Sequence, residues 1–174
     1  YTTETDLKLG GRLAIDNHGY LYFSLGAMNG FYDADIQNLS KPWGKMHRVH
    51  DDGRIPIDNP FVEVAGAVQS TWTVGHRAPQ GLEYDNETET LWGSEHGPRG
   101  GDEINLLIPG GNYGWPLTSR GVDYDGSPVE GKVDIEFNIE DIEDIEQPVV
   151  DLTPSPAISS FVIYHGDQFP NWEG

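Results

Sequence analysis

The chain has 174 residues, of which 29 are Asp or Glu and only 10 are Lys or Arg, giving a formal net charge of -19, and it has no cysteine. This length is sufficient for one domain with a sizeable core. The negative charge argues against nucleic acid as a partner because phosphate would be repelled, whereas calcium would be attracted. The absence of cysteine excludes disulfides, thiol catalysis and cysteine-ligated zinc, and no apolar run is long enough to cross a bilayer.

Two segments predict β-hairpins. Residues 12–16 and 20–24 are short strand-like runs on either side of a polar turn at 17–19. Residues 81–85 and 90–94 repeat this pattern after a spacing of roughly 70 residues. Tyr, Trp, Val and Ile in short bursts are typical of strands, so the sequence predicts an all-β protein.

The remaining segments are less regular. Residues 160–167 look like the start of a third hairpin, and 45–49 predicts a short strand. Residues 62–74 are apolar enough for another strand or two, while two prolines predict an extended loop at 55–60. The acidic segment 131–146 suits either a short helix or an irregular surface insertion.

Hairpins at this spacing are consistent with β-propeller blades that carry long loops. Antiparallel hairpins in a β-sandwich are an equally good interpretation of the composition. No segment looks like a linker, so we expect residues 1–174 to form part of one domain.

Three glycine-rich motifs follow one another in the middle of the chain. They are GHRAPQGL at 75–82, EHGPRGGDEIN at 95–105 and GGNYGWP at 110–116. In this order they closely resemble the soluble glucose/sorbosone and aldose sugar dehydrogenases, which use pyrroloquinoline quinone (PQQ). Further similar segments lie at 10–13, 52–60 and 166–174, so the resemblance covers nearly the whole chain.

The resemblance implies a six-bladed β-propeller that carries its cofactor on one face. The chain would be about half of such a propeller, with a blade preceding Tyr1 and the basic residues that grip PQQ following Gly174. It also implies a small sugar as substrate, an external electron acceptor and a periplasmic or extracellular location. The oligomeric state is not implied.

The resemblance also assigns residues to the cofactor site. A catalytic calcium would be held by PQQ oxygens and by the backbone carbonyls of Gly97 and Pro98, since a hard cation prefers oxygen ligands. Arg77 matches an arginine that stabilises negative charge on the reduced quinone. Gln80 matches a cofactor-binding residue, and Asp102 matches an acid that lines the same pocket.

A second, structural calcium is implied by three other positions. Its ligands would be the Glu103 carboxylate, the Tyr113 backbone carbonyl and the Asp123 carboxylate, with Glu146 as a further candidate. Solvated acids in an acidic protein are the alternative interpretation. We expect His96 to be a packing or rim residue rather than a base.

Four positions depart from the family pattern. Lys8 occupies the place of the histidine that serves as general base, and a lysine can act as a base only if its pKa is lowered substantially. Ala78 replaces an asparagine, Ala27 replaces an aspartate, and no tryptophan lies near Leu152. Two hypotheses therefore follow: a PQQ- and calcium-dependent aldose dehydrogenase with Lys8, Arg77 and Asp102 as catalytic residues, or a catalytically silent calcium-stabilised propeller that binds a sugar or a protein.

Overall fold

A computed structural model describes residues 10–28, 32–133 and 145–172 of the chain. Lys8, the predicted base, lies outside these residues. The described part contains two four-stranded antiparallel sheets and two short 3-10 helices at Ala34–Ile36 and Pro170–Trp172. None of its helices is of a length and apolarity that would let it cross a membrane.

The first sheet is a meander in which each strand pairs with the next one along the chain. In spatial order its strands are β1 (Leu13–Ile15), β2 (Tyr20–Leu25), β3 (Lys45–His50) and β4 (Thr71–Val74). The predicted hairpin at 12–24 is confirmed, with Leu13 opposite Phe23 and Ile15 opposite Leu21. The predicted strand at 45–49 is also confirmed.

The second sheet repeats this arrangement. Its strands are β5 (Pro79–Asp85), β6 (Thr90–Glu95), β7 (Glu103–Leu106) and β8 (Val150–Asp151), again in chain order. The predicted hairpin at 81–94 corresponds to β5 and β6. The ladder between them shifts register between Pro79 and Gly81, so that Gln80 lies at an irregularity where the side-chain alternation changes.

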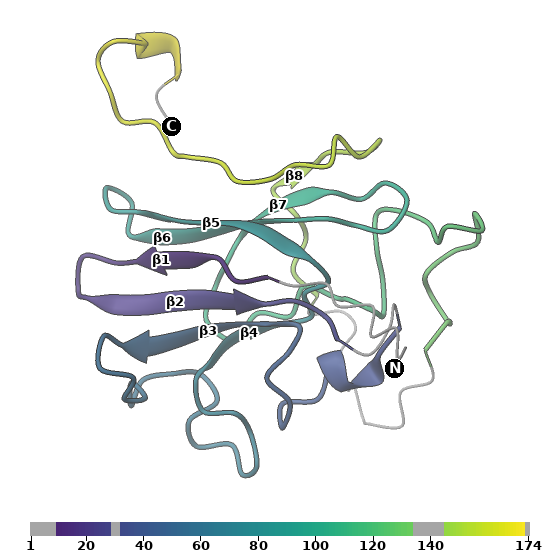
Figure 1. Cartoon of the computed structure of the whole chain (residues 1–174), viewed down its shortest axis with the longest axis horizontal. Coiled ribbons are helices and arrows are strands. Elements are labelled where there is room, and N and C mark those ends of the chain that lie inside the picture. Colours follow the sequence, from purple (N-terminus) through teal and green to yellow (C-terminus); the bar gives the residue numbers. More distant parts are fainter. Residues whose placement is uncertain (1–9, 29–31, 134–144, 173–174) are drawn as a thin grey trace, which may run out of the picture.

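The two sheets lie side by side, with the first strand of one next to the first strand of the other (Figure 1). Apolar side chains from both sheets meet between them and form the main core. Its buried members are Tyr22, Met46, Leu82, Leu91, Leu107 and Tyr113. A second apolar cluster of Ala27, Ile36, Trp115 and Val129 lies among the long connections.

Antiparallel connectivity places several loops at the same end of the two sheets. The chain leaves β2, β4 and β6 at this end and enters β3, β5 and β7 there. The connections at 26–44, 75–78 and 96–102 therefore converge. This shared end is where the glycine-rich motifs of the sequence are located.

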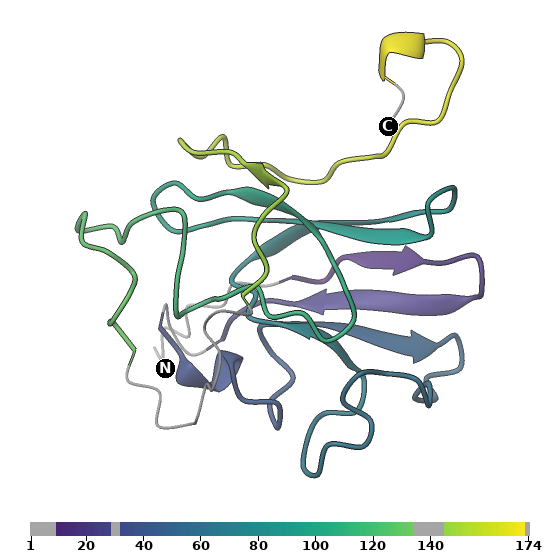
Figure 2. The ribbon, with the colours of Figure 1, turned by 180° about the vertical axis from the view of Figure 1, so that it is seen from behind.

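One prediction about strands is wrong, and another is confirmed for a single strand. Residues 160–167 form no strand, although the sequence suggested the start of a hairpin. The segment is extended and lies along the second sheet, where His165 Nε2 is 2.9 Å from Asp85 Oδ1, but it pairs with none of the described strands. The chain that follows it projects away from the sheets as an arm (Figures 1 and 2). In 62–74, where the sequence predicted another strand or two, β4 is one strand, and residues 60–70 consist mostly of turns. Of the acidic segment 131–146, residues 134–144 lie outside the described residues.

Candidate active site

A cavity of about 460 Å³ opens among the converging loops, and we call it the Arg77 cavity. Its wall contains all four predicted cofactor-binding residues together with the predicted acid. Its lining is Arg77, Ala78, Gln80, His96, Gly97, Pro98, Asp102, Tyr124, Ser155 and Ala157. Folding thus brings together residues from the β4–β5 connection, the start of β5 and the β6–β7 connection.

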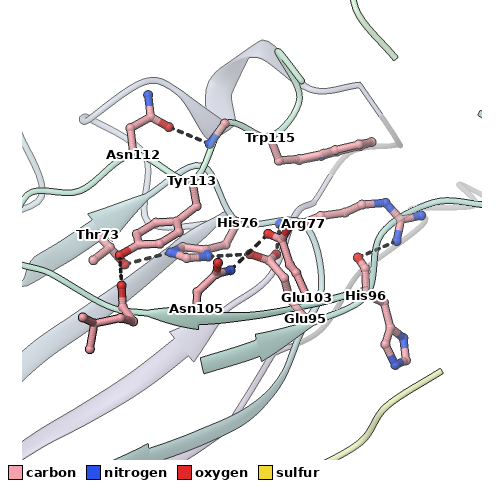
Figure 3. A network of polar contacts seen from close by, with 12 residues as sticks. Thr73, His76, Arg77, Glu95, His96, Glu103, Asn105, Asn112, Tyr113 and Trp115 are labelled. Atoms are coloured by element: carbon pink, nitrogen blue, oxygen red, sulfur yellow. Dashed lines mark hydrogen bonds and ion pairs between the residues drawn. The ribbon is translucent and has the colours of Figure 1, made fainter. Parts of the chain in front are cut away.

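Arg77 is held at both its backbone and its side chain. Its amide donates to Glu95 Oε2 at 2.8 Å, and its carbonyl accepts from the Ala27 amide at 2.8 Å. The guanidinium Nη1 donates to the Gly97 carbonyl oxygen at 2.6 Å and to the His96 carbonyl oxygen at 3.1 Å, the latter drawn in Figure 3. The guanidinium carbon lies 5.2 Å from the centre of the Trp115 ring. A charged group fixed in this way provides a preorganised positive charge at the cavity.

Asp102 fastens the β6–β7 connection. Its side chain is fully buried, and Oδ1 accepts from the Gly97 amide while Oδ2 accepts from the Ile158 amide, each at 3.2 Å. Both carboxylate oxygens are therefore already engaged by backbone donors. This geometry suits a residue that shapes the loop carrying Gly97 and Pro98.

His96 takes part in both the wall and the packing of this region. Its Nε2 atom contacts the Ile158 carbonyl, which ties the ring to the segment after β8. The ring points away from the Arg77 guanidinium (Figure 3). This position agrees with the expectation of a packing or rim residue.

A second cavity of about 280 Å³, which we call the acidic cavity, shares Arg77, His96 and Gly97 with the lining of the first. Glu95, Glu103, Glu130 and Glu146 line it, together with Tyr113. Burial, and next the nearby charge of Glu95, raise the pKa of Glu103 from 4.5 to about 8. The Glu103 carboxylate accepts from Asn105 Nδ2 at 3.0 Å. A half-buried carboxylate near the buried Glu95 carboxylate is a favourable place for a cation.

The three expected ligands of the structural calcium do not all line this cavity. Glu103 and Tyr113 do, and so does Glu146, whereas Asp123 forms an ion pair with Lys132. This ion pair and further contacts lower the pKa of Asp123. Among the described residues, no group of three or more His, Asp or Glu side chains is arranged to hold a metal ion.

Two of the departures from the family pattern can be located. Ala78 is buried and lines the Arg77 cavity, and position 78 therefore contributes no polar side chain to this cavity. Ala27 is 1% exposed and packs in the apolar cluster with Ile36 and Trp115, while its amide supports the Arg77 carbonyl. A carboxylate at this position would have to be accommodated in an apolar cluster.

The sequence analysis overlooked one polar pair, formed by His76 and Glu95. His76 Nδ1 lies 2.9 Å from Glu95 Oε1, and both side chains are buried. The available signal was their position, since His76 precedes Arg77 and Glu95 opens the next motif. A buried carboxylate requires a partner, and the only histidine in the preceding motif is the natural candidate.

Two adjacent four-stranded meanders whose first strands face each other, with loops of one end forming a charged cavity, define part of a β-propeller. The chain matches the model of the Glucose / Sorbosone dehydrogenase family over residues 1–174. It therefore belongs to this family. The resemblance noted in the sequence and the prediction of an all-β propeller fold are both confirmed.

Individual relatives agree with this assignment. Aldose sugar dehydrogenase YliI of Escherichia coli (strain K12) is 44% identical over 170 residues, which are 97% of this chain and 44% of that protein. The crystal structure of the soluble aldose sugar dehydrogenase of Escherichia coli in its apo form matches with a TM-score of 0.83 and 42% identity, over 94% of this chain and 45% of the other. The chain thus spans less than half the length of these relatives.

A cofactor-bound relative is also similar. The PQQ-bound form of the aldose sugar dehydrogenase of Streptomyces coelicolor matches with a TM-score of 0.56 and 34% identity, over 69% of this chain and 34% of that one. The family to which this chain belongs thus includes a protein whose structure contains PQQ.

Proposed function

We propose that the complete protein is a PQQ- and calcium-dependent aldose sugar dehydrogenase that oxidises the C1 hydroxyl of a sugar to the lactone. The observation that carries this proposal is the Arg77 cavity, where Arg77, Gln80, Gly97, Pro98 and Asp102 share one wall. Electrons would pass to an external acceptor. A periplasmic or extracellular location follows from the family alone.

The residues of this cavity are chemically suited to an anionic quinone and a hard cation. When bound, PQQ supplies the hydride acceptor. The guanidinium of Arg77 stays protonated and would stabilise negative charge that develops on the cofactor. The carbonyls of Gly97 and Pro98 would hold the catalytic calcium, since a carbonyl oxygen that accepts one hydrogen bond retains a second lone pair.

The other two assignments concern orientation and proton transfer. Gln80 would offer its side-chain amide to the cofactor, and Asp102 would keep the Gly97–Pro98 turn in place through its bond to the Gly97 amide. Lys8 would take the proton of the sugar hydroxyl, which requires a lowered pKa at that residue. In the acidic cavity, Glu103 and the Tyr113 carbonyl would hold a structural calcium, with Asp123 joining only if it leaves Lys132.

The test is a titration of the complete protein with PQQ in millimolar calcium, followed by absorbance, with glucose added at the end. We expect saturable binding and bleaching to the reduced quinone. Binding without reduction would place the defect at the base position, Lys8. Failure of the complete protein to bind PQQ in saturating calcium would refute the proposal.

One observation favours a second function. Ala78 and Ala27 remove two polar side chains from the region around Arg77, and Ala27 packs among apolar residues instead. A catalytically silent propeller, stabilised by calcium and binding a sugar or a protein, would retain the scaffold without these groups. Reduction of a dye by any aldose in the presence of added PQQ would exclude this alternative.

A further inference from the structure

A buried polar chain connects the first sheet to the Arg77 cavity, and it has no part in the roles proposed above. It runs from Thr73 in β4 through His76 and Glu95 to the backbone of Arg77 (Figure 3). We propose that Glu95, supported by His76, is a positioning residue that sets the place of the Arg77 guanidinium. This inference rests on the proposed function, because Arg77 is the residue assigned to the cofactor.

The geometry of Glu95 leaves little freedom. The residue is 5% exposed, and its Oε1 and Oε2 atoms are each engaged, by His76 Nδ1 at 2.9 Å and by the Arg77 amide at 2.8 Å. An ionised carboxylate only accepts hydrogen bonds, so His76 donates from Nδ1. Its other nitrogen, Nε2, lies 2.8 Å from Thr73 Oγ1, whose hydroxyl can donate to it. One tautomer of His76 therefore satisfies the whole chain of contacts.

His76 is itself immobilised. Its side chain is fully buried, and its ring stacks on Tyr113 with 4.8 Å between ring centres and 23° between ring planes. Because the ring cannot move without disturbing Tyr113, the position of Glu95 Oε1 is determined from the first sheet. The Glu95 carboxylate is therefore held in a fixed position, from which it accepts a hydrogen bond from the Arg77 amide.

The consequence for Arg77 is a backbone that is held on both sides. Glu95 accepts from its amide and the Ala27 amide donates to its carbonyl. From this fixed backbone the side chain reaches the carbonyls of His96 and Gly97, on the loop that would carry the catalytic calcium. Without the Glu95 carboxylate, a buried amide and a buried imidazole would lose their partner, and the start of the Arg77 side chain would shift.

Three variants of the complete protein test the inference. Glu95→Ala removes both contacts. Glu95→Gln is the conservative variant, because its oxygen can accept from the Arg77 amide and its nitrogen can donate to His76 in the other tautomer. Asp16→Ala is the matched control: Asp16 is 7% exposed and accepts from the Tyr20 amide and the Tyr22 hydroxyl, but it lies at the opposite end of the first sheet.

The first readout is the dissociation constant for PQQ in saturating calcium. We expect Glu95→Ala to raise the dissociation constant for PQQ by about tenfold or more, because the free energy lost when a buried donor beside the site is left unpaired corresponds to a change of this size. Glu95→Gln should restore it to within about threefold of the parent protein, and Asp16→Ala should leave it unchanged even where the melting temperature falls. A Glu95→Ala protein that melts earlier but binds PQQ like the parent would overturn the inference.

The second readout needs no cofactor and separates this inference from the proposed function. Proton exchange of the Arg77 amide and guanidinium with water, followed by NMR, should accelerate by about tenfold in Glu95→Ala. It should be unaffected in Asp16→Ala. If the parent protein fails to bind PQQ, the proposed function fails, while this measurement still decides whether Glu95 positions Arg77. Unchanged Arg77 exchange in Glu95→Ala would refute the positioning role.

Discussion

Two buried polar side chains of β3, Lys45 and His47, depend on neutral hydrogen-bond partners. Lys45 is fully buried, and its Nζ atom donates to the carbonyls of Ile36 at 2.9 Å and Trp43 at 3.0 Å. Burial lowers its pKa from 10.5 to about 8, although nearby Asp35 and Asp33 act in the opposite direction. The carbonyls that Lys45 satisfies belong to the connection that reaches the site end of the sheet.

His47 is a second such residue, and it makes stability depend on pH. The ring is 1% exposed, and its nitrogens contact Ser70 Oγ at 3.0 Å and the Pro42 carbonyl at 2.7 Å. Burial lowers its pKa from 6.5 to about 4. The folded state therefore favours the neutral imidazole, and the stability it contributes is fully present above pH 6.5 and is lost as the pH falls through about 4.

We expect the protein to lose about 3 kcal/mol of unfolding free energy through His47 alone over this pH interval. His47→Gln keeps a donor and an acceptor but cannot titrate, so its loss between neutral pH and about pH 4 should be smaller by that amount. Urea unfolding of both proteins at the two pH values measures the difference. Equal losses in the two proteins would show that His47 is not the titrating group.

At the scale of elements, the β6–β7 connection owes its course to glycines that allow close backbone contact. Gly101 has a φ of +71°, and a Cβ atom there would lie 2.4 Å from the Gly121 amide nitrogen. Residues 99 and 122 exchange backbone hydrogen bonds of 2.9 and 3.1 Å across this contact. The loop that carries Gly97 and Pro98 is thus held against residues 121–122 by backbone alone.

Gly101→Ala should therefore lower the free energy of unfolding more than an alanine substitution at a glycine that has a positive φ but no close neighbouring atoms. Gly126 is the matched control, because it has a φ of +88° and open space where a Cβ would be placed. Each change carries a conformational cost of about 1 kcal/mol, and Gly101→Ala should cost at least about 2 kcal/mol more because the neighbouring backbone must shift. Denaturant unfolding of the two variants gives this comparison, and similar values for both would argue against a tight loop contact.

At the scale of the whole molecule, the net charge of -19 acts against the compact state. The exposed acids lie mostly on loops and turns, where water and ions screen them. Raising sodium chloride from about 0.1 M to about 1 M shortens the screening length from about 10 Å to about 3 Å. Self-repulsion should therefore weaken as salt is added.

We expect the melting temperature to rise by several degrees over this range of salt. A matched osmolality of sucrose, which carries no charge, serves as the control for general exclusion from the protein surface. Differential scanning calorimetry in both series measures the effect. A melting temperature that stays constant or falls with sodium chloride would show that charge repulsion does not limit stability here.

The hairpins were predictable because the strand pattern and turn residues are local properties. The turn at 17–19 and the runs around it lead to β1 and β2 without reference to the rest of the chain. Residues 160–167 have a similar pattern but no ladder, because a strand also requires a neighbouring strand that local sequence does not specify. The same reason applies to 62–70, where apolar residues form turns.

The candidate site was predicted through motifs, and its members were brought together as expected around Arg77. The expected ligands of the structural calcium are separated in the structure: Glu103 and Tyr113 line the acidic cavity, whereas Asp123 lies beside Lys132. Sequence position alone could not decide this, because the partner of a carboxylate depends on which cation folding places beside it. The His76–Glu95 pair was missed for the same reason, since its two members are 19 residues apart and meet only where the β4–β5 connection reaches the end of β6.

The sequence by itself determined the family and the all-β class, and its motifs predicted a shared pocket for Arg77, Gln80, Gly97, Pro98 and Asp102, because motifs and strand patterns are encoded along the chain. Only the tertiary structure decided that Glu95 and His76 hold Arg77 and that burial raises the pKa of Glu103. Both outcomes depend on burial and on contacts between distant segments. These are properties of the folded chain, where low polarity and fixed neighbours determine what a charged group can do.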